Sequence, residues 1–99
     1  MATYAVAYIR WSEAQGPERY IKGVQNALKP FGGKYLAFAP VTVIEGSDPP
    51  VNLAIAEFPS LEAAKRFYES AEYGLSRKIR AISAKTDWLV FVDGLTIVP

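Results

Sequence analysis

Four side chains between residues 57 and 80 could take part in chemistry. Glu57 ends an apolar, strand-like run. A carboxylate held there, partly removed from water, suits a general acid or base. Arg80 could hold a carboxylate or an enolate through paired hydrogen bonds, and Tyr68 and Tyr73 could each donate a hydrogen bond to a substrate oxygen. Glu57, Arg80, Tyr68 and Tyr73 are therefore the candidate catalytic residues.

A purely structural interpretation stays open for these residues. Glu57 and Arg80 could form a buried ion pair, or Glu57 could be a solvated strand end. Tyrosines on an apolar helix stripe are more often core residues whose hydroxyls reach backbone groups. A second group of aromatic residues could line a ligand cavity or instead belong to the core or a dimer interface; it comprises Tyr8, Tyr35, Phe38 and Trp88.

Composition excludes several kinds of active site. The 99 residues include no cysteine and no histidine, the usual metal ligands and the commonest general base. The sequence also has no phosphate-binding loop, dinucleotide fingerprint or nucleophile elbow. We therefore expect a protein that needs no metal and no cofactor.

Charge and hydropathy exclude two classes of partner. The net charge is +1, and the one basic cluster is Arg77, Lys78, Arg80 and Lys85. This is too little for a nucleic-acid-binding domain, which carries a strong basic patch. No apolar run has the length of a membrane span, and no signal sequence is recognisable at the N-terminus. The sequence predicts no nucleic-acid partner, no membrane partner and a cytoplasmic location.

Four segments have the pattern of β-strands, with β-branched and aromatic residues between turn signals. They are 3–11, 34–45, 51–58 and 87–94. Pro40 implies a bulge or an edge position in the second, because proline cannot donate to a ladder. Residues 46–50 read as a turn, so the second and third strands are expected to pair antiparallel.

Two segments have helical periodicity. The first begins at Pro17 and is ended by Pro30 and Gly32–Gly33. The second begins at Ser60, a favourable N-cap, and Gly74 is expected to break it before a second short helix. Its expected buried stripe continues into that short helix and consists of Ala64, Phe67, Tyr68, Ala71, Leu75, Ile79 and Ile82.

The order of elements predicts an α+β fold in one domain over residues 1–99. The order β-α-β-β-α-β is ferredoxin-like, with a four-stranded antiparallel sheet and both helices on one face. In the third strand, Leu53, Ile55 and Glu57 share one face. The first, third and fourth strands are apolar on both faces, which is typical of a sheet covered on both sides. We therefore expect a homodimer in which a second copy covers the face without helices.

The sequence resembles a known family over almost its whole length. The resemblance rests on Glu45–Gly46, on residues 57–64 (Glu-Phe-Pro-Ser-Leu-Glu-Ala-Ala), on residues 67–73 (Phe-Tyr-Glu-Ser-Ala-Glu-Tyr), and on Arg80 and Asp93–Gly94. It is similar to domain of unknown function 1330, of the dimeric α+β barrel superfamily. The resemblance implies a ferredoxin-like protomer and a dimer with its sheets face to face, without an established reaction.

Three departures from the family pattern make the expected cleft more apolar. An acidic residue is missing from 14–17, Gly23 replaces a tyrosine, and Phe38 replaces a basic residue. Two functions remain. One is a homodimeric domain that binds a small apolar ligand, or a partner, through a sheet–helix cleft. The other is a cofactor-free enzyme, of isomerase or monooxygenase type, acting on a small apolar carbonyl or carboxylate compound.

Overall fold

The computed structural model describes residues 2–47 and 52–95 of the chain. The strands are β1 (Thr3–Trp11), β2 (Lys34–Ala39), β3 (Asn52–Phe58) and β4 (Ala84–Asp93). The helices are α1 (Gly16–Leu28), the 3-10 turn η1 (Lys29–Phe31), α2 (Leu61–Glu69) and α3 (Ala71–Ser83). The predicted α+β class and order of elements are confirmed, with α2 and α3 together in the place of the second helix.

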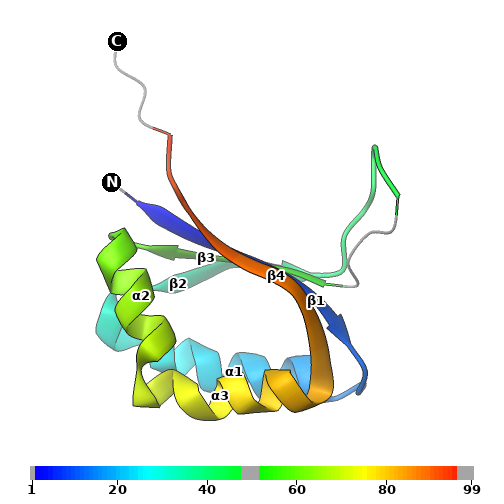
Figure 1. Ribbon diagram of the computed structural model, residues 1–99, viewed down its shortest axis with the longest axis horizontal. Coiled ribbons are helices and arrows are strands. Elements are labelled where there is room, and N and C mark those ends of the chain that lie inside the picture. Colours follow the sequence, from blue (N-terminus) through cyan, green and yellow to red (C-terminus); the bar gives the residue numbers. More distant parts are fainter. Residues whose placement is uncertain (1, 48–51, 96–99) are drawn as a thin grey trace.

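The four strands form one antiparallel sheet in the order β2-β3-β1-β4. This is the ferredoxin-like arrangement, in which the first strand lies in the interior of the sheet. Tyr4 of β1 is opposite Glu57 of β3 and Val92 of β4, and this register fixes which residues share a face. The helices lie together on one side of the sheet (Figure 1).

Small side chains cover the sheet face that meets the helices. Ala7, Ala54 and Ala56 are buried there, each no more than 6% exposed. Alanines on the sheet leave room for large residues from the helices and strand ends. The resulting core includes Val24 and Leu28 of α1, Phe58 of β3 and Phe67 of α2.

The opposite sheet face, called here the open face, carries large apolar side chains. Tyr8 and Trp88 lie against each other there, with ring centroids 3.9 Å apart. Trp88 is 42% exposed and Val92 is 52% exposed. In the part of the chain that the structure describes, no helix covers this face (Figure 1).

Serine residues define where the second and third helices begin. The Ser60 hydroxyl accepts a hydrogen bond from the Ala63 amide at 3.1 Å and caps α2. Ser70 ends α2 in an extended conformation and caps α3, accepting from the Tyr73 amide at 3.2 Å. The prediction that Gly74 breaks the helix is therefore wrong. Gly74 lies inside α3, and the break is at Ser70, whose side chain offers the backbone an alternative partner.

The predicted buried stripe is correct in α2, but in α3 it is wrong except for Ile79, which is half-buried. The residues of α3 that turn inward are Tyr73, Ser76, Arg80 and Ser83. Ala71 is exposed, and Leu75 and Ile82 are 72% and 79% exposed. The reason is the break at Ser70, since α3 starts with a new rotational phase and does not continue the stripe of α2.

Two strand boundaries differ from the predictions by three residues or more. The expected strand 34–45 ends at Ala39, so Pro40 stops β2, and the bulge lies earlier, between Tyr35 and Ala37. β4 begins at Ala84, three residues before the expected Asp87, directly after α3. Of the expected turn 46–50, residues 48–50 lie outside the described residues.

None of the helices in the described ranges is long and apolar enough to cross a membrane.

Candidate functional site

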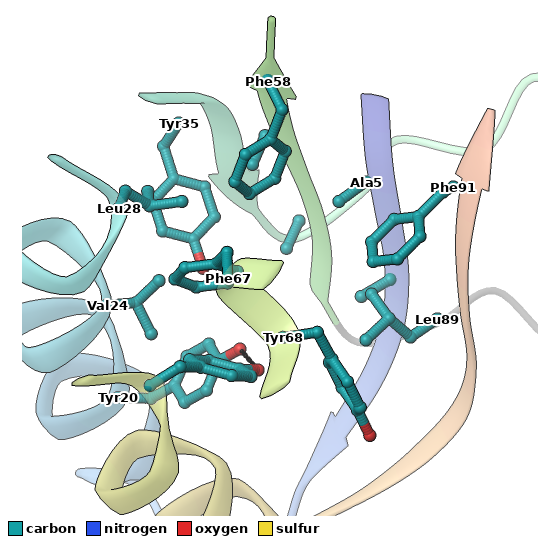
Figure 2. A pocket seen from close by; sticks show the side chains of 14 residues that line it. Ala5, Tyr20, Val24, Leu28, Tyr35, Phe58, Phe67, Tyr68, Leu89 and Phe91 are labelled. Atoms are coloured by element: carbon teal, nitrogen blue, oxygen red, sulfur yellow. Dashed lines mark hydrogen bonds between the residues drawn. The ribbon is translucent and has the colours of Figure 1, made fainter. Parts of the chain in front are cut away.

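A small cavity lies between the sheet and the helices, with a volume of about 30 Å³ (Figure 2). Space of this size holds on the order of one or two water molecules. Its walls are mostly alanines and large apolar or aromatic side chains, and four of the lining residues are tyrosines. The lining comprises Ala5, Ala7, Tyr20, Val24, Leu28, Tyr35, Ala54, Ala56, Phe58, Phe67, Tyr68, Tyr73, Leu89 and Phe91.

Three tyrosine hydroxyls are brought together in this apolar environment, and we call them the tyrosine cluster. Tyr20 comes from α1, Tyr35 from β2 and Tyr73 from α3. The hydroxyls of Tyr20 and Tyr73 are hydrogen-bonded at 2.5 Å. The Tyr35 side chain reaches from β2 into the cavity (Figure 2), and its hydroxyl also interacts with that of Tyr20.

The environment keeps the tyrosine cluster protonated. Burial raises the pKa of each of the three phenols well above the usual value, and electrostatic repulsion from a neighbouring tyrosine raises it further. The Arg80 guanidinium acts in the opposite direction and lowers each pKa, but burial outweighs it. At neutral pH these residues therefore act as neutral hydrogen-bonding groups and not as bases.

Arg80 lies on the inward face of α3 and is only 7% exposed. Its Nη1 donates a hydrogen bond to Thr86 Oγ1 at 3.1 Å. Its Nε is buried and has no hydrogen-bond partner among the described residues. Arg80 forms one wall of a second, open depression of about 540 Å³ between α3 and β4, called here the outer groove.

Tyr68 separates the cavity from the outer groove and lines both. Its ring stands on the side of the cavity nearest Leu89 (Figure 2). From the groove side, the Arg77 guanidinium lies 4.9 Å from the centre of the Tyr68 ring, within the range of a cation–π contact. Tyr68 is thus placed to contact a ligand on either side.

The structure does not bring Glu57 and Arg80 together. Ala54, Ala56 and Phe58 face the helices, so Glu57 between them faces the open side of the sheet. There its carboxylate is 3.5 Å from Lys34 Nζ, whereas Arg80 is on the helix side. The prediction that they form a pair in the cleft is wrong. It required the sheet face that carries Glu57 to meet the helices, and this face is on the other side of the sheet.

The other predicted residues fall into two groups. Tyr35, Tyr68 and Tyr73 line the cavity, and Phe38 packs on Tyr20 at its edge, with ring centroids 6.2 Å apart. Tyr8 and Trp88 instead lie on the open face, although Trp88 also reaches the rim of the outer groove. Strand parity alone could not have grouped them, because Tyr35 and Phe38 have opposite parity in β2 and share a side only through the bulge between Tyr35 and Ala37.

Sequence reasoning did not select Tyr20 or Thr86 as site residues. Tyr20 lies four residues before Val24 and eight before Leu28, so its spacing places it on the inward stripe of α1. That spacing was the available signal. Thr86, on β4, accepts a hydrogen bond from Arg80. Nothing in the local sequence indicates this contact, because it depends on where β4 begins.

Comparison with known families gives a match over residues 2–95 to the family described as Domain of unknown function (DUF1330). The chain belongs to this family. No curated protein matches the sequence. The DUF1330 assignment confirms the predicted resemblance and adds no reaction.

Solved structures agree with the fold. A protein of unknown function from Rhodopseudomonas palustris superposes with a TM-score of 0.77 at 17% identity, covering 97% of this chain and 84% of that one. A dimeric ferredoxin-like protein of unknown function from Jannaschia sp. CCS1 has a TM-score of 0.71 at 10% identity, covering 95% of this chain and 100% of that one. A candidate antibiotic biosynthesis monooxygenase from Nitrosomonas europaea has a TM-score of 0.61 at 13% identity, with 95% and 90% covered. At these identities the similarity shows the fold alone.

Proposed function

We propose that this DUF1330 protein is a homodimer that binds a small, largely apolar molecule in the cavity between its sheet and helices. The observation that carries the proposal is the tyrosine cluster, in which hydroxyls from three separate elements meet inside an apolar enclosure. Ligand sites commonly combine apolar walls with a few converging polar groups.

The cluster indicates which chemistry the ligand carries. Protonated phenols can donate hydrogen bonds, so a carbonyl or ether oxygen on an otherwise apolar molecule would be recognised. A cavity of about 30 Å³ is smaller than such a molecule. Binding therefore involves an outward movement of a wall, and half-buried Tyr68, next to the outer groove, is the residue placed to move.

The alternative function, a cofactor-free enzyme of isomerase or monooxygenase type, has less support from the geometry. The N. europaea protein is named as a candidate monooxygenase, but that likeness concerns the fold. Proton abstraction needs a base in the cavity. Glu57 faces the other side of the sheet, and the tyrosines have raised pKa values. We therefore prefer binding to turnover.

The homodimer part of the proposal rests on the open face. Its exposed Trp88 and Val92 form part of an apolar surface of the kind that marks interaction sites. The Jannaschia protein and one from Thermobifida fusca YX are dimeric ferredoxin-like proteins, which favours a second copy as the occupant. Packing of two open faces would bury more than about 1,000 Å² in total, as stable interfaces do.

The cavity site is tested by NMR titration with cyclohexanone, a small apolar ketone. We expect shifts confined to amides around the cavity, and their loss when Ala56→Val adds two methyl groups to the wall. The matched control is Ala37→Val, on an exposed position of β2. Ala7→Val provides a second filling variant if Ala56→Val unfolds. Equal affinity in the filled and unfilled proteins would contradict the proposal, and conversion of the ketone would favour the enzyme.

The dimer is tested by light scattering at micromolar concentration. The wild-type protein is expected to have the mass of two chains, and Val92→Lys on the open face to give a monomer. Leu75→Lys is the control, because Leu75 is also apolar and 72% exposed but lies on α3. A monomeric wild type, or dissociation by Leu75→Lys alone, would overturn the assignment of the open face.

A further inference from the structure

The outer groove between α3 and β4 has a charge distribution that differs from that of the cavity. Arg77 and Arg80 contribute two positive charges to its walls. Among the described residues that line it, none is Asp or Glu. The remaining walls include the rings of Tyr68 and Trp88 and the side chain of Leu89. The groove therefore combines a cationic end with flat apolar surfaces.

Arg80 is the residue that makes this groove unusual. A buried charge is costly unless it is paired and fully hydrogen-bonded. Arg80 is 7% exposed, and its Nη1 is bound to a neutral hydroxyl, that of Thr86. Within the described ranges, no carboxylate forms a salt bridge with it, and its Nε is unpartnered. The charge is thus held inside the protein without an anion to balance it.

The geometry of the guanidinium favours a carboxylate over a single acceptor atom. A guanidinium binds carboxylates through two parallel N–H groups. Thr86 engages Nη1 only, so the edge formed by Nε and Nη2 is not used by this contact. Arg77 adds a second positive charge while its guanidinium lies over the Tyr68 ring, and it would attract an anion toward the groove.

We propose that the outer groove is a binding site for a small aromatic carboxylate, with the carboxylate on Arg80 and the ring against Tyr68 and Leu89. This site is distinct from the tyrosine cluster, and the proposal holds whether or not the cavity binds a ligand. Thr86 acts as a positioning residue, because it fixes the orientation of the guanidinium that would meet the carboxylate.

The experiment titrates the wild-type protein with benzoate and, separately, with neutral benzamide, and follows both titrations by NMR. The protein is used in the oligomeric state that it has in solution. Benzoate is expected to shift the Arg80 Nε–H signal and the methyl signals of Leu89, and benzamide to leave both nearly unchanged. Arg80→Met keeps an unbranched apolar stem and removes the charge, and it is expected to weaken benzoate binding about ten-fold or more. Thr86→Val should weaken it less.

The matched control is Arg66→Met, which makes the same change of charge on an exposed position of α2 outside the groove. Equal weakening by Arg66→Met and Arg80→Met would show nonspecific attraction and overturn the proposal. Benzamide binding as tightly as benzoate would also overturn it. If Arg80→Met changes the molecular mass in solution and leaves benzoate binding intact, Arg80 pairs with a second copy and not with a ligand. Loss of cyclohexanone binding in Ala56→Val concerns only the cavity, so the two proposals can fail separately.

Discussion

The hydroxyls of Tyr20 and Tyr73 meet across the contact between α1 and α3, although the residues are 53 positions apart in the chain. Both side chains are buried, at 5% and 2% exposure. Each hydroxyl therefore satisfies the other in a place that water does not readily reach. The pair fixes the separation of the two helices and holds one end of the cavity.

Removing one hydroxyl of this pair is expected to destabilise the protein. Tyr73→Phe removes the hydrogen bond between the Tyr73 and Tyr20 hydroxyls and leaves Tyr20 with Tyr35 only, which costs about 0.5–1.5 kcal/mol of the free energy of unfolding. The double variant with Tyr20→Phe should cost less than the sum of the two single variants, because it leaves no orphaned hydroxyl in the pair. Urea denaturation of the four proteins measures this coupling. Tyr4→Phe serves as a control for the loss of a hydroxyl on the open face, and strict additivity would contradict the prediction.

Alkaline pH is expected to lower the stability of the fold. The pKa values of Tyr20, Tyr35 and Tyr73 are raised above the value of 10.0 that holds for an unperturbed tyrosine. Above about pH 10 the unfolded chain releases these protons and the folded protein keeps them. Each tyrosine then lowers the free energy of unfolding by about 1.4 kcal/mol per pH unit, up to its folded pKa. Below pH 10 this effect is absent.

Denaturation at several pH values between about 8 and 12 measures this slope, with Tyr35→Phe as the comparison, because it has one fewer buried phenol. The variant should lose stability less steeply above pH 10 than the wild type. Identical slopes in the two proteins would mean that Tyr35 ionises in the folded state as readily as in the unfolded chain.

Two helical glycines are expected to respond differently to alanine. A Cβ at Gly74 meets no atom within 4 Å, so Gly74→Ala should stabilise α3 by up to about 1 kcal/mol. A Cβ at Gly23 would clash with Ser76 Oγ, and the hydroxyl must rotate away. Gly23→Ala should therefore gain less or lose stability, and adding Ser76→Ala should restore the gain. Thermal melts decide this, and a larger gain at Gly23 than at Gly74 would be inconsistent with the packing of α1 on α3.

The serine caps can be ranked by their contacts. Ser60 makes one hydrogen bond through its hydroxyl, accepting from Ala63. The Ser70 hydroxyl accepts from the Tyr73 amide and also donates to the Phe67 carbonyl at 2.7 Å. Loss of a cap costs about 0.5–2 kcal/mol, and Ser70→Ala should cost more than Ser60→Ala. Hydrogen exchange at the Tyr73 amide should accelerate in Ser70→Ala only.

The class of fold could be predicted from the sequence because strand and helix periodicities alternate clearly along the chain. Parity also placed Leu53, Ile55 and Glu57 on one face correctly. Hydropathy alone did not show which way that face points, since both faces of β3 are apolar. The size of the side chains carried the missing information: Ala54 and Ala56 leave the space that helices need. The Glu57–Arg80 hypothesis failed at this step.

The candidate site was only partly predictable. The structure places Tyr35, predicted as a ligand-cavity residue, together with Tyr68 and Tyr73, predicted as catalytic residues, around one cavity. Their roles in binding or catalysis stay predictions. The inward position of Arg80 contradicts the usual preference of arginine for the surface. It follows from the rotational phase of α3. This phase is set by the hydrogen bond from the Tyr73 amide to the Ser70 hydroxyl and not by an apolar pattern.

The break at Ser70 makes the length of the following helix as important as its composition. Arg80 lies ten residues after this break, and each residue of an α-helix turns the next by about 100°. Deletion of a single residue between Ser70 and Arg80 would rotate the guanidinium away from Thr86 and bring a different side chain into the outer groove. Insertions and deletions in α3 would therefore change the recognition chemistry of this protein more abruptly than most substitutions, while leaving the sheet intact.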